Sequence, residues 1–462
     1  MYDNKRPDIL AYTNAKMAQY NDMKGMKATF RTLGCKLNYA ETSAIEDKLH
    51  AVGVETSDGG NADICLVNTC SVTEMADHKC RQVIHKLVKD NPDAFVAVMG
   101  CYVQLQPQKV AEIEGVDLVV GMEDKGRILE YIAEGIAQKR RQTEALHVQK
   151  SGAMRDIRTF VPSCSRGGRT RYFLKVQDGC DYFCTYCTIP YARGLSRSPS
   201  ADSVVSQAKE VAAQGGKEIV ITGVNIGDFG RKGGESFGML VKALDKVEGI
   251  ERYRISSIEP NLLTKEIIDF CASSRRFTPH FHIPLQSGSD TVLKLMHRRY
   301  DTKFFAEKIS EVHNAMPDAF IGIDVIVGTR GETPELFGET LAFLEALDFA
   351  QLHVFPYSER PGTQALKIPY IVRQQDKHER TQRLIALSEK KRKDFYRKFC
   401  GTTRKVLFEH TVHNGVIHGF TDNYIRVEAP GENAQDLDNR LVNVALGGFN
   451  AKETALKGTI IL

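Results

Sequence analysis

The feature that most constrains this chain is a short segment with three cysteines, Cys180-Asp-Tyr-Phe-Cys184-Thr-Tyr-Cys187. It follows an apolar run, Tyr172–Val176, that predicts a buried β-strand, so the thiols are expected in the loop after that strand. Three thiolates suit the soft irons of an iron–sulfur cluster, which a fourth ligand would normally close. A cluster held by three cysteines leaves one iron open. A zinc site would need a further Cys or His, which residues 188–193 lack; a zinc knuckle and a chance grouping are the alternatives.

From Ala28 onward, short predicted strands alternate with helices, the pattern of an open parallel α/β sheet. Each of three predicted strands is followed within three residues by a cysteine. These pairs are Thr29–Leu33 with Cys35, Ile64–Val67 with Cys70, and Phe95–Met99 with Cys101. Because the carboxyl ends of parallel strands share one edge of a sheet, where ligands collect, the three thiols are expected to lie together. This predicts a second three-cysteine cluster site, with incidental strand-end cysteines as the alternative.

The other cysteines serve as a comparison. Cys65 lies inside a predicted strand and Cys80 inside a predicted helix, so both are interpreted as small buried side chains. Cys164, Cys271 and Cys400 have no partner at metal spacing. Eleven cysteines without a disulfide pattern indicate free thiols and a reducing cytoplasm. No apolar run approaches the roughly 18 residues of a membrane span, so no membrane partner is expected.

From Arg171 the sequence predicts about six strand–helix units. Their strands are Tyr172–Val176, Glu218–Thr222, Arg252–Ser257, His280–Leu285, Phe320–Val327 and Gln351–Phe355. So few units cannot close a (β/α)8 barrel, which leaves an open, partial barrel that suits a macromolecular substrate. The last 60 or so residues predict about five short strands and a small β-barrel. The predicted organisation is a disordered extension (1–26), an α/β domain (27–137), a basic linker (138–170), the partial barrel (171–398) and the β-barrel (399–462).

Positive charge is concentrated in two segments, although the net charge is only +4. Residues 138–171 contain nine Lys or Arg against Glu144 and Asp156. A long helix predicted at Val372–Phe399 contains the run Lys390-Lys-Arg-Lys393. Each segment is interpreted either as a solvated surface or as a contact for nucleic-acid phosphates.

The string GCDYFCTYCTIPYARG, together with TLGCKLNYAET, VNTCSVT and GCYVQ, resembles the motifs of the radical S-adenosylmethionine (SAM) methylthiotransferases. The likeness is strongest to the branch that acts on N6-threonylcarbamoyladenosine in tRNA, which Arg254-Ile-Ser-Ser-Ile-Glu-Pro260 also resembles, and it runs from about residue 27 to the C-terminus. The resemblance implies two 4Fe–4S clusters. Their ligands are Cys180, Cys184 and Cys187 for the cluster whose open iron binds SAM, and Cys35, Cys70 and Cys101 for an auxiliary cluster.

Polar, Gly-rich loops follow the predicted barrel strands, and the resemblance implies that they hold SAM. The expected contacts are Tyr186 in the cysteine segment, Thr222, Asn225, Glu259 and Gln286. A helix cap or a strand-end turn is the alternative role for the loop residues. Gly328-Thr-Arg-Gly departs from the more usual Gly-Phe-Pro-Gly of the family, so no contact is assigned there.

The resemblance further implies that one SAM methylates a sulfide on the auxiliary cluster and a second generates a 5′-deoxyadenosyl radical. The methylthio group then replaces hydrogen on carbon 2 of N6-threonylcarbamoyladenosine at position 37, in the tRNA anticodon stem-loop. A reduced flavodoxin or ferredoxin is the implied electron donor, and the C-terminal barrel resembles the RNA-binding TRAM domain. Alternatives are the same chemistry on N6-isopentenyladenosine in tRNA or on a ribosomal-protein aspartate, and a noncatalytic iron–sulfur protein that binds RNA.

Overall fold

The structure is a computed structural model. It describes residues 20–57, 60–140, 157–165, 170–431 and 437–461. By their internal packing the residues form two units. The N-terminal unit is Met1–Ser165 with Ile189–Leu195, and the C-terminal unit is Arg166–Thr188 with Ser196–Leu462. The short segment after the cysteine loop therefore packs with the N-terminal unit, which the linear domain boundaries did not foresee.

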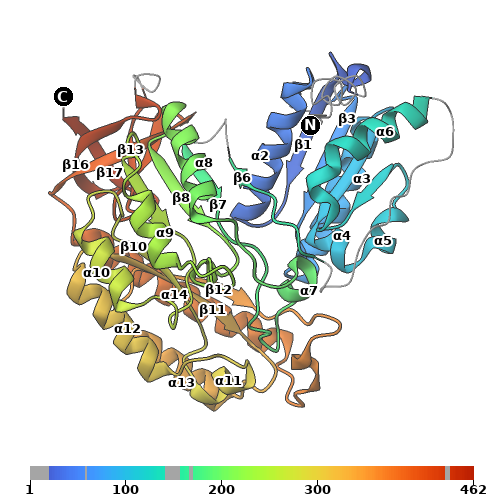
Figure 1. Cartoon of the computed structure of the whole chain (residues 1–462). Coiled ribbons are helices and arrows are strands. Elements are labelled where there is room, and N and C mark those ends of the chain that lie inside the picture. The colour runs from blue at the N-terminus through green and yellow to red at the C-terminus, as the bar shows by residue number, and fades with distance from the viewer. Residues whose placement is uncertain (1–19, 58–59, 141–156, 166–169, 432–436, 462) are drawn as a thin grey trace, which may run out of the picture. The chain divides into compact units, whose positions relative to one another are not determined.

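The described part of the N-terminal unit is built on a five-stranded parallel sheet in the order β2-β1-β3-β4-β5 (Figure 1). The strands are β1 (Lys27–Thr32), β2 (Glu55–Thr56), β3 (Ile64–Thr69), β4 (Phe95–Gly100) and β5 (Leu118–Val120). The helices are α2 (Lys36–Ala51), α3 (Glu74–Asp90), α4 (Cys101–Leu105), α5 (Pro107–Ala111), α6 (Ile128–Arg140) and α7 (Ile189–Arg193). The strand order reverses beside β1, and such switch points are where open α/β sheets bind ligands.

Alternation along β3 explains why helices cover both faces of this sheet. Ile64 and Leu66 pack in one apolar core with α2 and α6, whereas Cys65 and Val67 pack in a second core with α3, α4 and α5. Successive side chains of a strand point to opposite faces, so an uninterrupted apolar run requires two cores. Cys65 thus lies in the apolar core, as its position inside a strand predicts.

The N-terminal boundary differs from the prediction. Residues 1–19 of the predicted disordered extension lie outside the described part of the chain. Tyr20 and Met23, however, belong to the apolar core beneath β1, and Met23 is completely buried. The extension prediction is therefore wrong for residues 20–26, because Met23 supplies a core contact that a polar local composition conceals.

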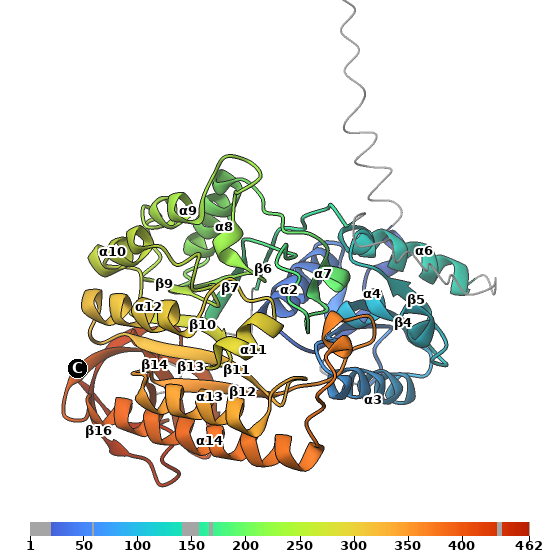
Figure 2. The same ribbon diagram turned by 90° about the horizontal axis from the view of Figure 1, so that it is seen from below.

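The C-terminal unit begins with a partial parallel barrel. Its strands are β7 (Arg171–Lys175), β8 (Glu218–Thr222), β9 (Arg252–Ile255), β10 (His280–Gln286), β11 (Phe320–Val327) and β12 (Gln351–Pro356). Parallel bridges from Tyr253 to Phe277 and from Ser257 to His282 join the two halves. The outer helices are α8 (Ala201–Ala213), α9 (Phe237–Leu244), α10 (Lys265–Ser273), α11 (Asp290–Leu295), α12 (Thr302–Ala315), α13 (Pro334–Ala346) and α14 (Gln374–Arg397) (Figure 2). The predicted partial barrel is confirmed.

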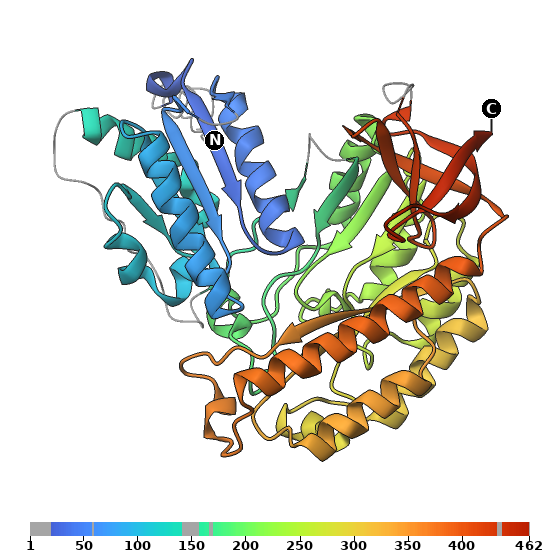
Figure 3. The ribbon, with the colours of Figure 1, turned by 180° about the vertical axis from the view of Figure 1, so that it is seen from behind.

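Helix α14 leads into a closed β-barrel, drawn in red in Figure 3. The described strands run in the order β13-β14-β15-β17-β16 around it. They are β13 (Thr403–His413), β14 (Val416–Thr421), β15 (Arg426–Pro430), β16 (Leu441–Phe449) and β17 (Leu456–Ile461). The predicted small β-barrel is thus confirmed. In the described part of the chain, no helix is both long and apolar enough to cross a membrane.

The basic run of α14 binds the protein itself. Lys391 donates to the carbonyl oxygens of Glu345 and Leu347, at 2.9 and 2.7 Å. Arg392 donates to carbonyl oxygens in the turn between β16 and β17, and Lys393 pairs with Glu453 in the same turn. Neither the solvated-surface nor the phosphate interpretation foresaw this role. The charges hold α14 against α13 on one side and the β-barrel on the other.

The β-barrel closes the amino-terminal end of the partial barrel through Tyr424, in the turn between β14 and β15. The Tyr424 ring lies 4.6 Å from the His280 ring and 4.8 Å from the Arg254 guanidinium. Arg254 is buried and pairs with the buried Glu218 at 2.9 Å. Burial acts to raise the pKa of Glu218, but the charges of Arg254 and Arg252 outweigh it and hold that pKa below its usual value.

We predict that Glu218→Gln lowers the free energy of unfolding by about 3–5 kcal/mol at pH 7, because it leaves buried guanidinium groups without their anion. Since the folded state lowers the pKa of Glu218, its contribution is present at neutral pH and disappears as the pH falls through that lowered pKa. Urea unfolding of the C-terminal unit at pH 7 and in acid measures both effects. Glu266→Gln, which removes an exposed partner of Lys242, is the control and should change little. Equal effects of the two substitutions would contradict the prediction.

Candidate functional site

The N-terminal cysteines occupy three neighbouring strand-to-helix junctions. Cys35 separates β1 from α2, Cys70 follows β3, and Cys101 is the first residue of α4 after β4. Because β1, β3 and β4 are adjacent in the sheet, their carboxyl ends lie side by side. The structure therefore brings together the three cysteines that the sequence singled out, at the edge where ligands of such sheets bind.

Two glycines allow these junctions to approach closely. A Cβ on Gly34 would lie 2.8 Å from the Cys70 sulfur, and one on Gly100 would lie 2.4 Å from the Thr69 carbonyl oxygen. Both glycines also have positive φ angles, 101° and 107°, which other residues rarely adopt. The backbone before Cys35 and before Cys101 is thus shaped to bring these residues against the end of β3.

Two of the three thiols, those of Cys70 and Cys101, are buried enough to hold their protons when no metal is bound. Burial raises the pKa of Cys70 to about 11 and that of Cys101 to about 12. The positive charge of Arg193 opposes both shifts, whereas the neighbouring Cys35 adds to them. A metal must displace these protons, and its binding then stabilises the thiolates that burial alone disfavours.

The cysteine loop of the C-terminal unit, residues 180–187, has little regular structure, but hydrogen bonds fix its conformation. The Cys187 N–H donates to the Cys184 carbonyl oxygen at 3.0 Å, which closes a tight turn. Thr185 donates its hydroxyl to the Leu295 carbonyl oxygen at 2.8 Å, and its own carbonyl oxygen accepts from the Ala365 N–H at 2.9 Å. Segments distant in the sequence thereby fix the positions of Cys180, Cys184 and Cys187.

Arg298 is a site residue that the sequence analysis missed. Its Nη1 donates to the Cys184 sulfur at 3.2 Å, its Nη2 contacts the Glu259 carboxylate, and its Nε donates to the Tyr300 hydroxyl at 3.0 Å. Burial raises the pKa of Glu259, and the charge of Arg298 counters that shift. No motif spacing marks Arg298; only the fold, which brings the segment after α11 back to the cysteine loop, reveals it.

The predicted SAM contacts lie at the carboxyl ends of neighbouring strands. Thr222 ends β8, Asn225 follows three residues later, Glu259 follows β9, and Gln286 ends β10. The Thr222 Oγ1 and the Asn225 Oδ1 are buried and have no hydrogen-bond partner among the described residues. Buried polar atoms are normally paired, so these two fit a polar ligand. Gln286 has a φ of 73°, a backbone conformation that is uncommon outside glycine and clusters at functional sites.

Tyr186, the fifth predicted contact, lies inside the cysteine loop, and its hydroxyl is buried. Burial raises its pKa well above the usual value, while the charge of Arg298 opposes that shift. The negative charges of Cys184, Cys187 and Glu259 add to the shift, so these groups share one small region. The hydroxyl therefore keeps its proton and can act as a hydrogen-bond donor there.

The two donor sets consist of cysteine thiols, the ligands that iron–sulfur clusters use. Across the residues that the structure describes, no three Cys, His, Asp or Glu side chains converge as ligands of one ion. Ligands of a four-iron cluster each bind a different iron, so their sulfurs stand further apart than the ligands of one zinc. All six ligand candidates are thiols rather than disulfides. Two sets of three thiols, without histidine, are the ligand type of iron–sulfur clusters, and their assignment to two clusters stays a prediction.

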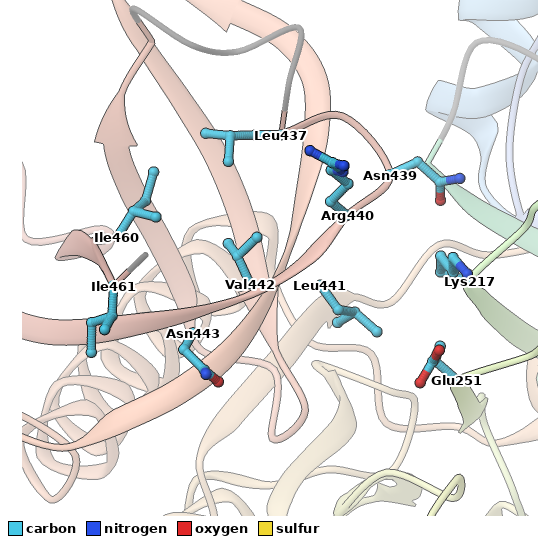
Figure 4. A pocket seen from close by; sticks show the side chains of 10 residues that line it. All are labelled: Lys217, Glu251, Leu437, Asn439, Arg440, Leu441, Val442, Asn443, Ile460 and Ile461. Carbon is cyan, nitrogen blue, oxygen red and sulfur yellow. The ribbon is translucent and has the colours of Figure 1, made fainter.

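The pocket in Figure 4 lies away from this region. It has a volume of about 830 Å³ and is lined by β-barrel residues, including Leu441 and Ile460, together with Lys217 and Glu251. Lys217 and Glu251 precede β8 and β9, whereas the predicted SAM contacts follow these strands. The pocket is thus at the opposite ends of the barrel strands from the cysteine loop.

Comparison with known families assigns both parts of the chain. Residues 27–121 match the family described as "Uncharacterized protein family UPF0004", and residues 174–344 match the radical SAM superfamily. The radical S-adenosylmethionine methyltransferase TsrM from Kitasatospora setae has a related fold, with a TM-score of 0.55 and 16% identity, over 74% of this chain and 77% of that chain. At this identity the likeness concerns the fold alone.

Full-length relatives are much more similar in sequence. The threonylcarbamoyladenosine tRNA methylthiotransferase MtaB of Bacillus subtilis (strain 168) is 40% identical over 90% of this chain and 93% of its own length. The protein of the same name from Aquifex aeolicus (strain VF5) is 37% identical over 88% and 97%. A tRNA-2-methylthio-N(6)-dimethylallyladenosine synthase from Bacillus licheniformis is 32% identical over 95% and 86%. The family prediction is confirmed, and this chain belongs to the threonylcarbamoyladenosine tRNA methylthiotransferases of the radical SAM superfamily.

Proposed function

We propose that this protein is the enzyme that methylthiolates carbon 2 of N6-threonylcarbamoyladenosine at position 37 of tRNA. The observation that carries the proposal is the 40% identity to a curated threonylcarbamoyladenosine tRNA methylthiotransferase across nearly the whole of both chains. Two sets of three cysteines support the proposal: the N-terminal trio of Cys35, Cys70 and Cys101, and the trio of Cys180, Cys184 and Cys187 in the cysteine loop. Sulfur insertion into carbon needs one site for radical chemistry and one for sulfur. Radical SAM membership implies a 4Fe–4S cluster and SAM as cofactors.

The cysteine loop would hold the cluster that binds SAM. Its ligands are Cys180, Cys184 and Cys187, and together with SAM this cluster supplies the one-electron chemistry that removes hydrogen from an unactivated carbon. Arg298 keeps the Cys184 sulfur hydrogen-bonded, which orients that ligand and tunes the site. Thr222 and Asn225 offer polar atoms without a present partner for the amino-acid or ribose part of SAM.

The N-terminal trio would hold an auxiliary 4Fe–4S cluster. Cys35, Cys70 and Cys101 provide three ligands, so one iron stays available for a sulfur atom. The close approach at Gly34 and Gly100 supports this assignment. It brings three strand ends together through backbone conformations that packing of the sheet alone does not require. The auxiliary site is the proposed source of the inserted sulfur.

The polar interior of the partial barrel favours the threonylcarbamoyl substituent over an apolar one. His282 on β10 pairs with Asp324 on β11 at 2.7 Å and stacks on His353 of β12 at 4.9 Å. His282 and Asp324 are each 19% exposed, whereas Phe281 and Ile283, on the opposite face of β10, are fully buried. A dimethylallyl group would gain little from such polar groups, but a threonyl carboxylate and hydroxyl can hydrogen-bond to them.

The anticodon stem-loop of tRNA is the proposed partner, and a reduced flavodoxin or ferredoxin the proposed electron donor. Because three of the four cations in the basic run of α14 bind the protein itself, we place the phosphate contacts elsewhere. Lys405, Lys452 and Lys457 are exposed on the β-barrel and are suitable. Much of the basic linker, residues 141–156 and 166–169, lies outside the described residues.

Iron counting tests the two sites. After anaerobic reconstitution we expect about eight irons per chain, and about half as many when Cys35, Cys70 and Cys101 are all replaced by Ala. That triple variant should still cleave SAM but form no methylthiolated tRNA. Cys400→Ala, at an exposed thiol, is the matched control and should lose neither iron nor activity. Full iron content in the triple variant would show that Cys35, Cys70 and Cys101 do not hold an auxiliary cluster.

Arg298→Gln should lower the rate of SAM cleavage by about 10–100-fold, the usual effect of losing a partner that orients a metal ligand, and should lower the iron content by at most about half. Release of 5′-deoxyadenosine and iron content are the two measurements. Arg275→Gln, at an exposed arginine of the same unit, is the control. Unchanged cleavage in Arg298→Gln would exclude the proposed role.

The substrate can be tested by mass spectrometry of tRNA nucleosides. Deletion of the gene should remove the methylthio group from threonylcarbamoyladenosine and leave methylthiolated isopentenyladenosine unchanged. His353→Leu, introduced on a plasmid, should restore less of the mark than the wild-type gene, since it removes a polar group from the barrel interior. Loss of the isopentenyl mark instead would favour the alternative substrate.

A further inference from the structure

A buried charge network lies beside the N-terminal trio. Glu41 of α2 binds two cations, Lys125 at 2.5 Å and Arg193 at 3.1 Å. The three side chains are only 1–3% exposed. Buried charges are normally held by ion pairs and hydrogen bonds, so these contacts fix the position of both cations.

The network is joined to the cysteines through Asn38. The Asn38 Oδ1 accepts a hydrogen bond from the Arg193 Nη2 at 2.5 Å and another from the Cys35 sulfur at 3.8 Å. The Asn38 Nδ2 donates to the carbonyl oxygens of Leu33, which directly follows β1, and Thr69, which ends β3. One amide therefore fixes the ends of two cysteine-bearing strands and the position of the guanidinium.

Arg193 also lies next to the other two cysteines. Helix α7 packs against α4, and its Ala192 shares a small apolar cluster with Cys101 (Figure 1). The charge of Arg193 acts on both Cys70 and Cys101. Arg193 thus acts electrostatically on Cys70 and Cys101 and is linked to Cys35 through Asn38, while its ion pair with Glu41 keeps the guanidinium in place.

The sequence position of Arg193 is unusual for this role. It comes six residues after Cys187, the last cysteine of the other trio. The chain leaves the C-terminal unit after Thr188, contributes Ile189–Leu195 to the N-terminal unit, and returns at Ser196. A folding role alone would not require this segment to carry a buried cation to the opposite trio.

We propose that Arg193 is a positioning residue that supplies positive charge to the auxiliary cluster and stabilises its more negative, reduced form. The inference rests on the proposed function only in assigning a cluster to Cys35, Cys70 and Cys101. Each added electron makes the cluster more negative, and a fixed cation at short range in a buried site favours that state. Glu41 acts in the opposite sense, because it partly neutralises the same cation.

The test uses full-length protein with Cys180, Cys184 and Cys187 replaced by Ala, so that only the auxiliary cluster is present. Its reduction potential is measured by dithionite titration followed by electron paramagnetic resonance. Arg193→Gln should shift the reduction equilibrium about tenfold toward the oxidised cluster, a decrease of about 59 mV for one electron. Glu41→Gln should raise the potential, and Arg193→Lys, which keeps the charge, should stay near the parent value.

Arg127→Gln, at an arginine of the same unit that pairs with Glu130 on the surface, is the matched control and should not move the potential. Opposite shifts in Arg193→Gln and Glu41→Gln support the proposal, since a merely structural defect would not change sign. An unchanged or higher potential in Arg193→Gln overturns it. If Arg193→Gln does not fold, a raised potential in Glu41→Gln with a parent-like potential in Arg193→Lys supports the proposal. An unchanged or lower potential in Glu41→Gln then overturns it. Absence of iron from the parent variant would overturn the auxiliary cluster itself, and this inference with it.

Discussion

Repulsion among neighbouring thiolates is the constraint on which the rest of this structure depends. Of the three cysteines at adjacent strand ends, Cys70 and Cys101 are buried, so the three cannot all ionise unless iron, or a nearby cation, compensates for their charge. The parallel sheet supplies the convergence, Gly34 and Gly100 allow the close approach, and Arg193 supplies compensation. The cysteine loop of the other unit has the same arrangement, with Arg298 donating to the Cys184 sulfur.

Much of this architecture is legible in the sequence because it rests on local patterns. Apolar runs ending in Gly-Cys or Thr-Cys place Cys35, Cys70 and Cys101 without a structure, since parallel strands share one edge. Arg193 and Arg298 were not foreseen as partners of the cysteines, because their roles depend on contacts between residues far apart in the chain. Met23 was misjudged for a similar reason: its burial depends on a core to which its polar neighbours give no clue.

The run Lys390–Lys393 shows why charge density alone does not identify a nucleic-acid surface. Most of its cations are committed to carbonyl oxygens and to Glu453, so they hold α14 and the β-barrel together. At the barrel's other contact, Tyr424 and Arg254 perform the same task. The β-barrel is therefore fixed to the amino-terminal ends of the partial barrel strands, whereas the cysteine loop lies at their carboxyl ends.

Because Ile189–Leu195 belongs to the N-terminal unit, neither unit is complete when the chain is cut between them. A fragment that stopped at residue 165 would lack Ala192 beside Cys101 and would keep Glu41 with only one of its cations. A fragment that began at residue 166 would expose an apolar turn built for another core. Each unit is thus built from two separate segments of the chain, and we expect the two units to fold only as parts of one polypeptide.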